Sequence, residues 1–162
     1  MSEVRIVDFP ATKVMVAEHL GPPELETQTA LRLVRWRVAN RLSVERHRSY
    51  GIHYTDPRVT PPEQHRVDFC LSIDDEPPPN ADGLVTREIP ASRCAVVRHL
   101  GSREKNTTAI WLLTEWLPAS GETAGDFPLF FHYVNVGPAI PESELITDVY
   151  LPLAPDRAIQ NR

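Results

Sequence analysis

The stretch PATKVMVAEHLG at residues 10–21 returns 80 residues later as PASRCAVVRHLG at residues 90–101. Six of the twelve positions are identical, and two more exchange residues of closely similar chemistry. Both stretches are rich in residues that favour β-strands, and both end at a glycine that interrupts the pattern. A match of this length at a fixed period predicts a chain built from two homologous halves.

Further landmarks recur at the same offset of 80 residues. Trp36 is matched by Trp116, and Asp68 is matched by Asp148. With a slip of one residue, the pair at 53–54 is matched by the pair at 132–133, and each of these His-Tyr pairs precedes a turn-forming stretch. The repeat therefore extends over most of the chain.

Each half is predicted to run strand, helix, strand, strand. Apolar residues recur at helical spacing in one segment of each half, and short runs rich in β-formers are separated by proline-rich connectors. The first half predicts a strand at 11–19, a helix at 24–40, and strands at 50–55 and 66–73. The second half predicts a helix at 108–117 that ends at Pro118, and strands at 130–135 and 146–153.

We expect one domain over residues 1–157, followed by a frayed tail at 158–162. Its two repeats cover about 3–75 and 84–155. The acidic, proline-rich link at 74–83 is interpreted as a loop rather than a domain boundary, because one half alone has too little core. The predicted fold is α+β, a tandem duplication with a pseudo-two-fold axis, an antiparallel sheet with helices, and a central ligand cleft.

Composition excludes several classes of protein. The chain has 162 residues and a net charge of −5, the opposite of the basic footprint of a nucleic-acid-binding domain. No apolar run approaches the ~20 residues of a membrane helix, and the first residues do not resemble a signal peptide. We expect a cytoplasmic protein with no membrane partner, in which Cys70 and Cys94 are buried thiols. No Cys or His spacing indicates a metal site, and no cofactor is expected.

A crevice where two related halves meet is the expected place for a ligand, because pockets for small molecules are concave and largely apolar or aromatic. Aromatic rings around a carboxylate suit a lipophilic cation. Asp148 is the most informative candidate, since it interrupts an apolar strand run. The candidate ligand-binding residues are Asp148, Tyr150, Tyr133, Phe131, Trp111, Phe69, Tyr54 and His53.

Structural alternatives stay open for these residues. Any one aromatic side chain can belong to the core, and Trp36 with Trp116 is interpreted as a pair of packing residues. Asp148 can be a solvent-facing acid at a strand end, and Asp68, close to Arg66, can share a surface ion pair with it. The histidines at 53 and 132 can be structural or peripheral.

Catalysis finds little support in the sequence. The chain has no GxSxG turn, no glycine-rich phosphate loop, and no Ser or Cys with an evident His partner. An acid/base pair formed by Asp148 and a tyrosine is conceivable. The sequence therefore favours binding without turnover and leaves enzymatic activity open.

At these residues the chain resembles the GyrI-like small-molecule-binding family, over about residues 4–154. This family also forms the effector-binding half of AraC-type regulators and occurs in multidrug-sensing regulators. An aromatic-rich strand, a D-x-P turn, T-P and R-x-D follow in the family's order. The matching segments are IPASRCAVVRHLG, YGIHYTDPRVTPPEQHRVDFCLSI, WLPASG and PLFFHYVNVGPAIPESELITDVYLPL.

The resemblance implies a duplicated fold with a ligand channel between the halves for hydrophobic, often cationic, compounds. Asp148 stands where the family often has a glutamate, four residues before a proline. Phe131 replaces the usual acid of an F-E-x-Y motif. Residues 1–3 leave no room for a helix-turn-helix, so the resemblance implies an effector domain without its own DNA-binding module.

Alternatives to a small-molecule-binding protein also come from the resemblance. One is a DNA gyrase inhibitor-like, protein-binding role. The other is hydrolysis of reactive cyclopropane-containing compounds, as in some relatives. The partners to be expected are a small hydrophobic or cationic ligand and either DNA gyrase or a separate regulator, with no direct nucleic-acid contact.

Overall fold

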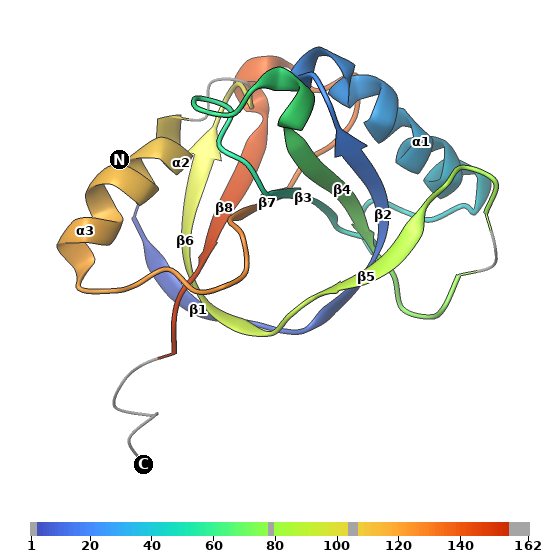
Figure 1. Cartoon of the computed structure of the whole chain (residues 1–162). Helices are drawn as coiled ribbons and strands as arrows, with labels where there is room; N and C mark the ends of the chain where they lie inside the picture. The colour runs from blue at the N-terminus through green and yellow to red at the C-terminus, as the bar shows by residue number, and fades with distance from the viewer. Residues whose placement is uncertain (1–2, 78–79, 104–106, 156–162) are drawn as a thin grey trace. The chain divides into compact units, whose positions relative to one another are not determined.

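The computed structural model describes residues 3–77, 80–103 and 107–155, and these fall into two compact units (Figure 1). One unit is Ala11–Ile89, and the other combines Met1–Pro10 with Pro90–Arg162. Each unit contains four antiparallel strands and helical segments packed on their sheet. The predicted α+β class with antiparallel strands is thus confirmed.

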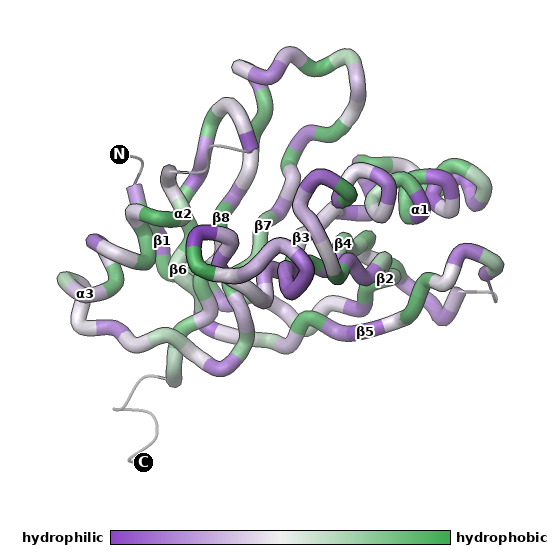
Figure 2. Tube along the Cα trace, turned by 45° about the horizontal axis from the view of Figure 1, so that its top comes forward, coloured by the Kyte–Doolittle hydropathy of each residue, from purple (hydrophilic) through white to green (hydrophobic). Residues whose placement is uncertain are grey.

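The unit Ala11–Ile89 has the strand order β3-β4-β2-β5. Its strands are β2 (Thr12–Leu20), β3 (Ser49–His53), β4 (Arg66–Ser72) and β5 (Val85–Ile89). Helix α1 (Glu26–Ala39) packs on β2 and β4. Figure 2 shows hydrophobic and hydrophilic residues alternating along α1, the pattern of a helix with one buried face.

The second unit has the strand order β1-β6-β8-β7. Its strands are β1 (Arg5–Phe9), β6 (Ser92–Leu100), β7 (Phe130–Tyr133) and β8 (Ile146–Pro152). Its helical segment runs through α2 (Thr107–Trp111), the π-helical turn η3 (Leu112–Trp116) and α3 (Leu117–Ser120). Short 3-10 turns, η1 (Pro23–Leu25), η2 (Pro62–Gln64) and η4 (Glu142–Glu144), complete the chain.

One face of each sheet packs against helix and forms the core. Trp36 is buried in one of these cores, and Trp116 packs against the other, so the interpretation of both as packing residues is confirmed. The core under α1 contains Met15, Ala17, Leu33, Trp36, Leu71 and Leu84. The core of the second unit contains Ala95, Val97, Ala109, Leu112, Phe131, Val149, Leu151 and Leu153. The prediction that Cys70 and Cys94 are buried thiols is also confirmed.

Strands β1 and β5 were missed by the sequence patterns. Each is a five-residue strand whose charged and apolar residues leave most of it exposed or half-exposed, and each lies at an edge of its sheet. Such strands carry little hydrophobic signal, since only one neighbour and one face stabilise them. β1 pairs with β6, and β5 pairs with β2, so the compact units do not follow the boundaries of the sequence repeat.

The expectation that Pro118 ends the second helix was wrong. The helical segment continues through Pro118 to Ser120 and ends at Gly121, whose φ of 78° is left-handed. The turn before Pro118 is π-helical, with the Leu117 amide donating to the Leu112 carbonyl. This wider turn accommodates a ring that has no N–H and would clash with the carbonyl four residues earlier.

Within the described residues, no helix is both long and apolar enough to cross a bilayer. The predicted tail at 158–162 lies outside the described residues.

Candidate functional site

Asp148 and Tyr150 lie on the face of β8 that points away from the helices. The residues between and beside them, Val149 and Leu151, belong to the helix-side core, and side chains on a strand alternate between faces. Strand register places Arg98 of β6 beside Asp148, on the same face. An acid in an apolar strand thus meets a cation from the neighbouring strand.

The Asp148 carboxylate is held at both oxygens by Arg98. Arg98 Nε donates to Oδ1 at 2.8 Å, and Arg98 Nη2 donates to Oδ2 at 3.1 Å. The Asp148 side chain is 8% exposed and that of Arg98 is 50% exposed. The hydrogen bond to this carboxylate raises the pKa of Arg98, so the guanidinium stays charged. The alternative of a solvent-facing acid at position 148 does not fit this burial.

An aromatic cluster lies on the same face, one row along the sheet. The rings of Tyr150 and Phe130 stack with centroids 4.9 Å apart at an interplanar angle of 4°. Phe9 of β1 meets the edge of this pair, with its centroid 5.4 Å from Tyr150 and 5.0 Å from Phe130. Parallel stacks and edge contacts of this kind are favourable geometries for aromatic rings. Aromatic surface and a paired carboxylate therefore adjoin.

Three other candidates of this unit lie on the helix side of the sheet. Phe131 is a buried core residue, while Trp111 and Tyr133 pack against the same core. The Arg103 guanidinium lies over the Tyr133 ring at 4.9 Å. These three residues share a core, and strand alternation separates them from Asp148 and Tyr150. Their role in ligand binding stays a prediction.

Asp68, the counterpart of Asp148, does not form a surface ion pair with Arg66. Its carboxylate is fully buried, and Oδ2 accepts hydrogen bonds from Tyr54 Oη at 3.0 Å and Arg87 Nη1 at 2.7 Å. Arg66 instead lies over the Tyr54 ring, 4.1 Å from its centroid. Among the described residues, Asp68 Oδ1 has no hydrogen-bond partner. Arg87 extends the network by also pairing with Glu18.

Tyr54 acts as the hydrogen-bond donor in this network. Burial, followed by the charge of Asp68, raises the pKa of Tyr54 to about 12, so its hydroxyl stays protonated. Of the remaining candidates in this unit, Phe69 packs on the helix-side core, and His53 shares that face because its β4 partner is Val67. Burial, with a smaller contribution from His65, lowers the pKa of His53 to about 4. His53 is therefore neutral near pH 7.

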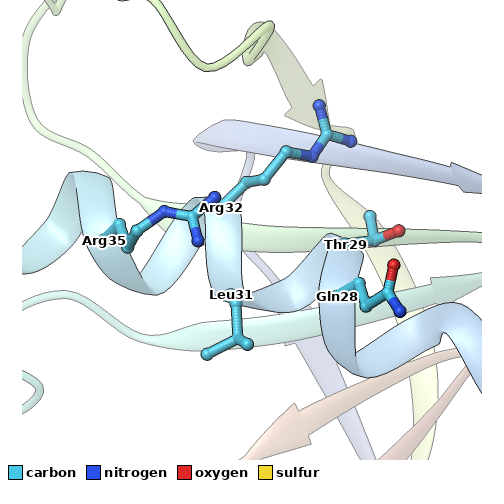
Figure 3. Close-up of a pocket in the computed structure, with 5 residues that line it drawn as sticks. All are labelled: Gln28, Thr29, Leu31, Arg32 and Arg35. Carbon is cyan, nitrogen blue, oxygen red and sulfur yellow. The ribbon is translucent and has the colours of Figure 1, made fainter.

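A surface hollow of about 480 Å³ lies along α1, away from all of these residues (Figure 3). It is lined by Gln28, Thr29, Leu31, Arg32 and Arg35. The Arg32 guanidinium already donates to the backbone carbonyls of Asp82 and Glu18. No sequence pattern indicated this hollow, and its walls come almost entirely from one helix face.

The structure adds Arg98, Arg87, Phe130 and Phe9 to the residues that sequence reasoning proposed. The repeat offered one signal for them: it paired Asp68 with Asp148, and two equivalent buried acids each require a cation. No group of three or more His, Cys, Asp or Glu side chains that could hold a metal occurs in the part of the chain that the structure describes.

Removal of the Arg87 guanidinium is expected to destabilise the protein strongly. Arg87→Gln leaves the fully buried Asp68 carboxylate with only the Tyr54 hydroxyl, and we expect the free energy of unfolding to fall by about 2 kcal/mol. Urea unfolding followed by circular dichroism measures this. The control is Arg46→Gln, which breaks the exposed ion pair with Asp74 and should cost less than about 0.5 kcal/mol. Equal losses in both variants would contradict the network.

Acid is expected to destabilise the protein through His53. Its folded-state pKa of about 4 lies below the model value of 6.5, so the unfolded chain binds the proton more readily. The free energy of unfolding should therefore fall as the pH drops from 6.5 towards 4, by about 3 kcal/mol in total. His53→Gln should lack this part of the pH dependence when each protein is compared with itself at neutral pH. A pH dependence identical to that of the wild type would refute the assignment.

The chain is similar to curated proteins over nearly its whole length. It is 37% identical over 154 residues to the probable transcriptional regulator YgiV of Escherichia coli (strain K12), covering 94% of this chain and 96% of that protein. It is 25% identical over 155 residues to a DNA gyrase inhibitor of Erwinia billingiae (strain Eb661), covering 93% and 97% of the two chains.

Solved structures share the fold. The crystal structure of the EcmrR C-terminal domain matches with a TM-score of 0.76 at 15% identity, covering 95% of this chain and 98% of that domain. In the cryo-EM structure of an EcmrR-DNA complex, the match spans 57% of the longer chain. The family model of the GyrI-like small molecule binding domain matches residues 2–154. The chain belongs to the GyrI-like small molecule binding domain family.

Proposed function

We propose that this domain binds a lipophilic or aromatic small molecule on the face of the sheet that carries Asp148 and Tyr150. The observation that carries the proposal is the stack of Tyr150 on Phe130 next to the Asp148 carboxylate. Aromatic faces supply contact area for an apolar ligand, and a few polar groups at their edge fix its orientation. Membership of a small-molecule-binding family supports the same function.

Matched contacts in the two units support duplication of an ancestral half, which we include in the proposal. His19 Nδ1 lies 2.7 Å from the Thr29 hydroxyl, and His99 Nδ1 lies 2.8 Å from the Thr108 hydroxyl. Nε2 of His19 lies 3.1 Å from the carbonyl oxygen of Gly21, and Nε2 of His99 lies 2.8 Å from that of Ser102. Such agreement 80 residues apart, outside the face proposed for the ligand, is the conserved frame expected of a repeat.

A regulatory role is the use of binding that we favour. The curated relative with 37% identity is named a probable transcriptional regulator and is matched over 96% of its length. A protein-binding role against gyrase is the alternative, supported by 25% identity to a named gyrase inhibitor. Inhibition of supercoiling by a stoichiometric amount of this protein, absent with an unrelated acidic domain, would favour that alternative.

Ligand binding is tested with the neutral fluorescent probe N-phenyl-1-naphthylamine. We expect fluorescence enhancement with a Kd of about 10 µM, and about tenfold weaker binding by Tyr150→Leu, because the stack loses one ring. Trp116→Leu is the matched control, since it removes an aromatic ring from the helix-side core. It should lower the melting temperature and leave the Kd within about twofold.

The absence of any enhancement with wild-type protein would overturn the proposed function. Equal weakening in Tyr150→Leu and Trp116→Leu would place the probe elsewhere. Circular dichroism of each variant at the assay temperature establishes that the folded protein is being compared.

A further inference from the structure

The cation that faces Asp148 belongs to the protein itself. Arg98 donates to both carboxylate oxygens, with its Nε at 2.8 Å and its Nη2 at 3.1 Å. Two parallel hydrogen bonds between a guanidinium and a carboxylate are among the stronger polar contacts in proteins. A cationic ligand would have to displace Arg98 or lie beside its positive charge.

Arg98 also has capacity left for a ligand. Its side chain is 50% exposed, and, among the described residues, its Nη1 makes no hydrogen bond. Register places Arg98 directly opposite Asp148, one row along the same face from Val96 and Tyr150. A guanidinium with a free N–H beside an aromatic stack suits an aromatic compound that carries a carboxylate or another acceptor.

The neighbouring strand adds positive charge to this face. Arg5 of β1 pairs in register with Val96, which is paired in turn with Tyr150, and cross-strand partners share a face. Arg5 is exposed. Two arginines and one carboxylate thus surround the Tyr150 row, so the charge around it is not that of a cation site.

We propose that Arg98 determines the charge of the ligand: it closes Asp148 to cations and favours aromatic compounds that bear an anionic or hydrogen-bond-accepting group. The inference rests on the proposed function, since it assigns ligand chemistry to the same face of β8. It makes Arg98 a specificity-determining residue and Asp148 the group that holds it in place.

Two naphthalene compounds of similar size and opposite charge test the inference: naphthalene-2-carboxylate and 2-naphthylmethylammonium. Each is titrated against protein loaded with N-phenyl-1-naphthylamine, and displacement gives its Kd. We expect wild-type protein to bind the carboxylate about tenfold more tightly than the ammonium compound. Arg98→Gln should reverse this preference, because the variant loses the donor and leaves the Asp148 carboxylate available.

The double variant Arg98→Gln/Asp148→Asn is expected to lose the gain in ammonium affinity, which links that gain to the carboxylate. Arg93→Gln is the matched control: it removes the same charge from the same strand, but Arg93 shares the helix-side parity of Ala95 and pairs with Glu122. Its ratio of the two affinities should equal that of the wild type.

The possible failures are distinguishable. If the neutral probe binds and wild-type protein prefers the ammonium compound, or if Arg98→Gln leaves the ratio unchanged, the inference is overturned while the proposed function stands. If no probe binds to wild-type protein, the proposed function is overturned and the inference with it.

Discussion

Each sheet is covered by helix on one face, and this constraint organises the rest of the molecule. A strand sends alternate side chains to opposite faces, so every second residue must fill the helix-side core. Val149 and Leu151 do so in β8, while Asp148 and Tyr150 point the other way. The face without helix is therefore where polar and aromatic groups can be arranged for binding without loss of the core.

A carboxylate inside such a sheet needs a compensating cation, and the two halves supply it differently. Position 98 is an arginine that pairs with Asp148, whereas the equivalent position 18 is a glutamate. The cation for Asp68 comes instead from Arg87 on the edge strand, where the equivalent position 7 is a valine. The two acids keep the same place in the repeat, while the arginine has changed strand.

This difference gives the two acids different surroundings. Asp68 is fully buried in a network with a tyrosine hydroxyl and a guanidinium, which is typical of a structural group. Asp148 is held by an arginine that is half-exposed and next to stacked rings. Divergence of this kind lets one half of a duplicated domain keep a structural role while the other acquires ligand specificity.

The sequence by itself determined the repeat, the six longer strands, the position of α1, and the family, because each leaves a local or periodic signal along the chain. It also singled out Asp148 and Tyr150, since an acid and an aromatic ring two residues apart share one face of a strand. The tertiary structure alone decided which residues stand opposite them. Arg98 lies 50 residues from Asp148, and Phe9 lies far from both Phe130 and Tyr150. The edge strands and the helix through Pro118 were likewise decided by their neighbours, because strand register and the packing of a π-helical turn depend on contacts distant in sequence, which no local pattern encodes.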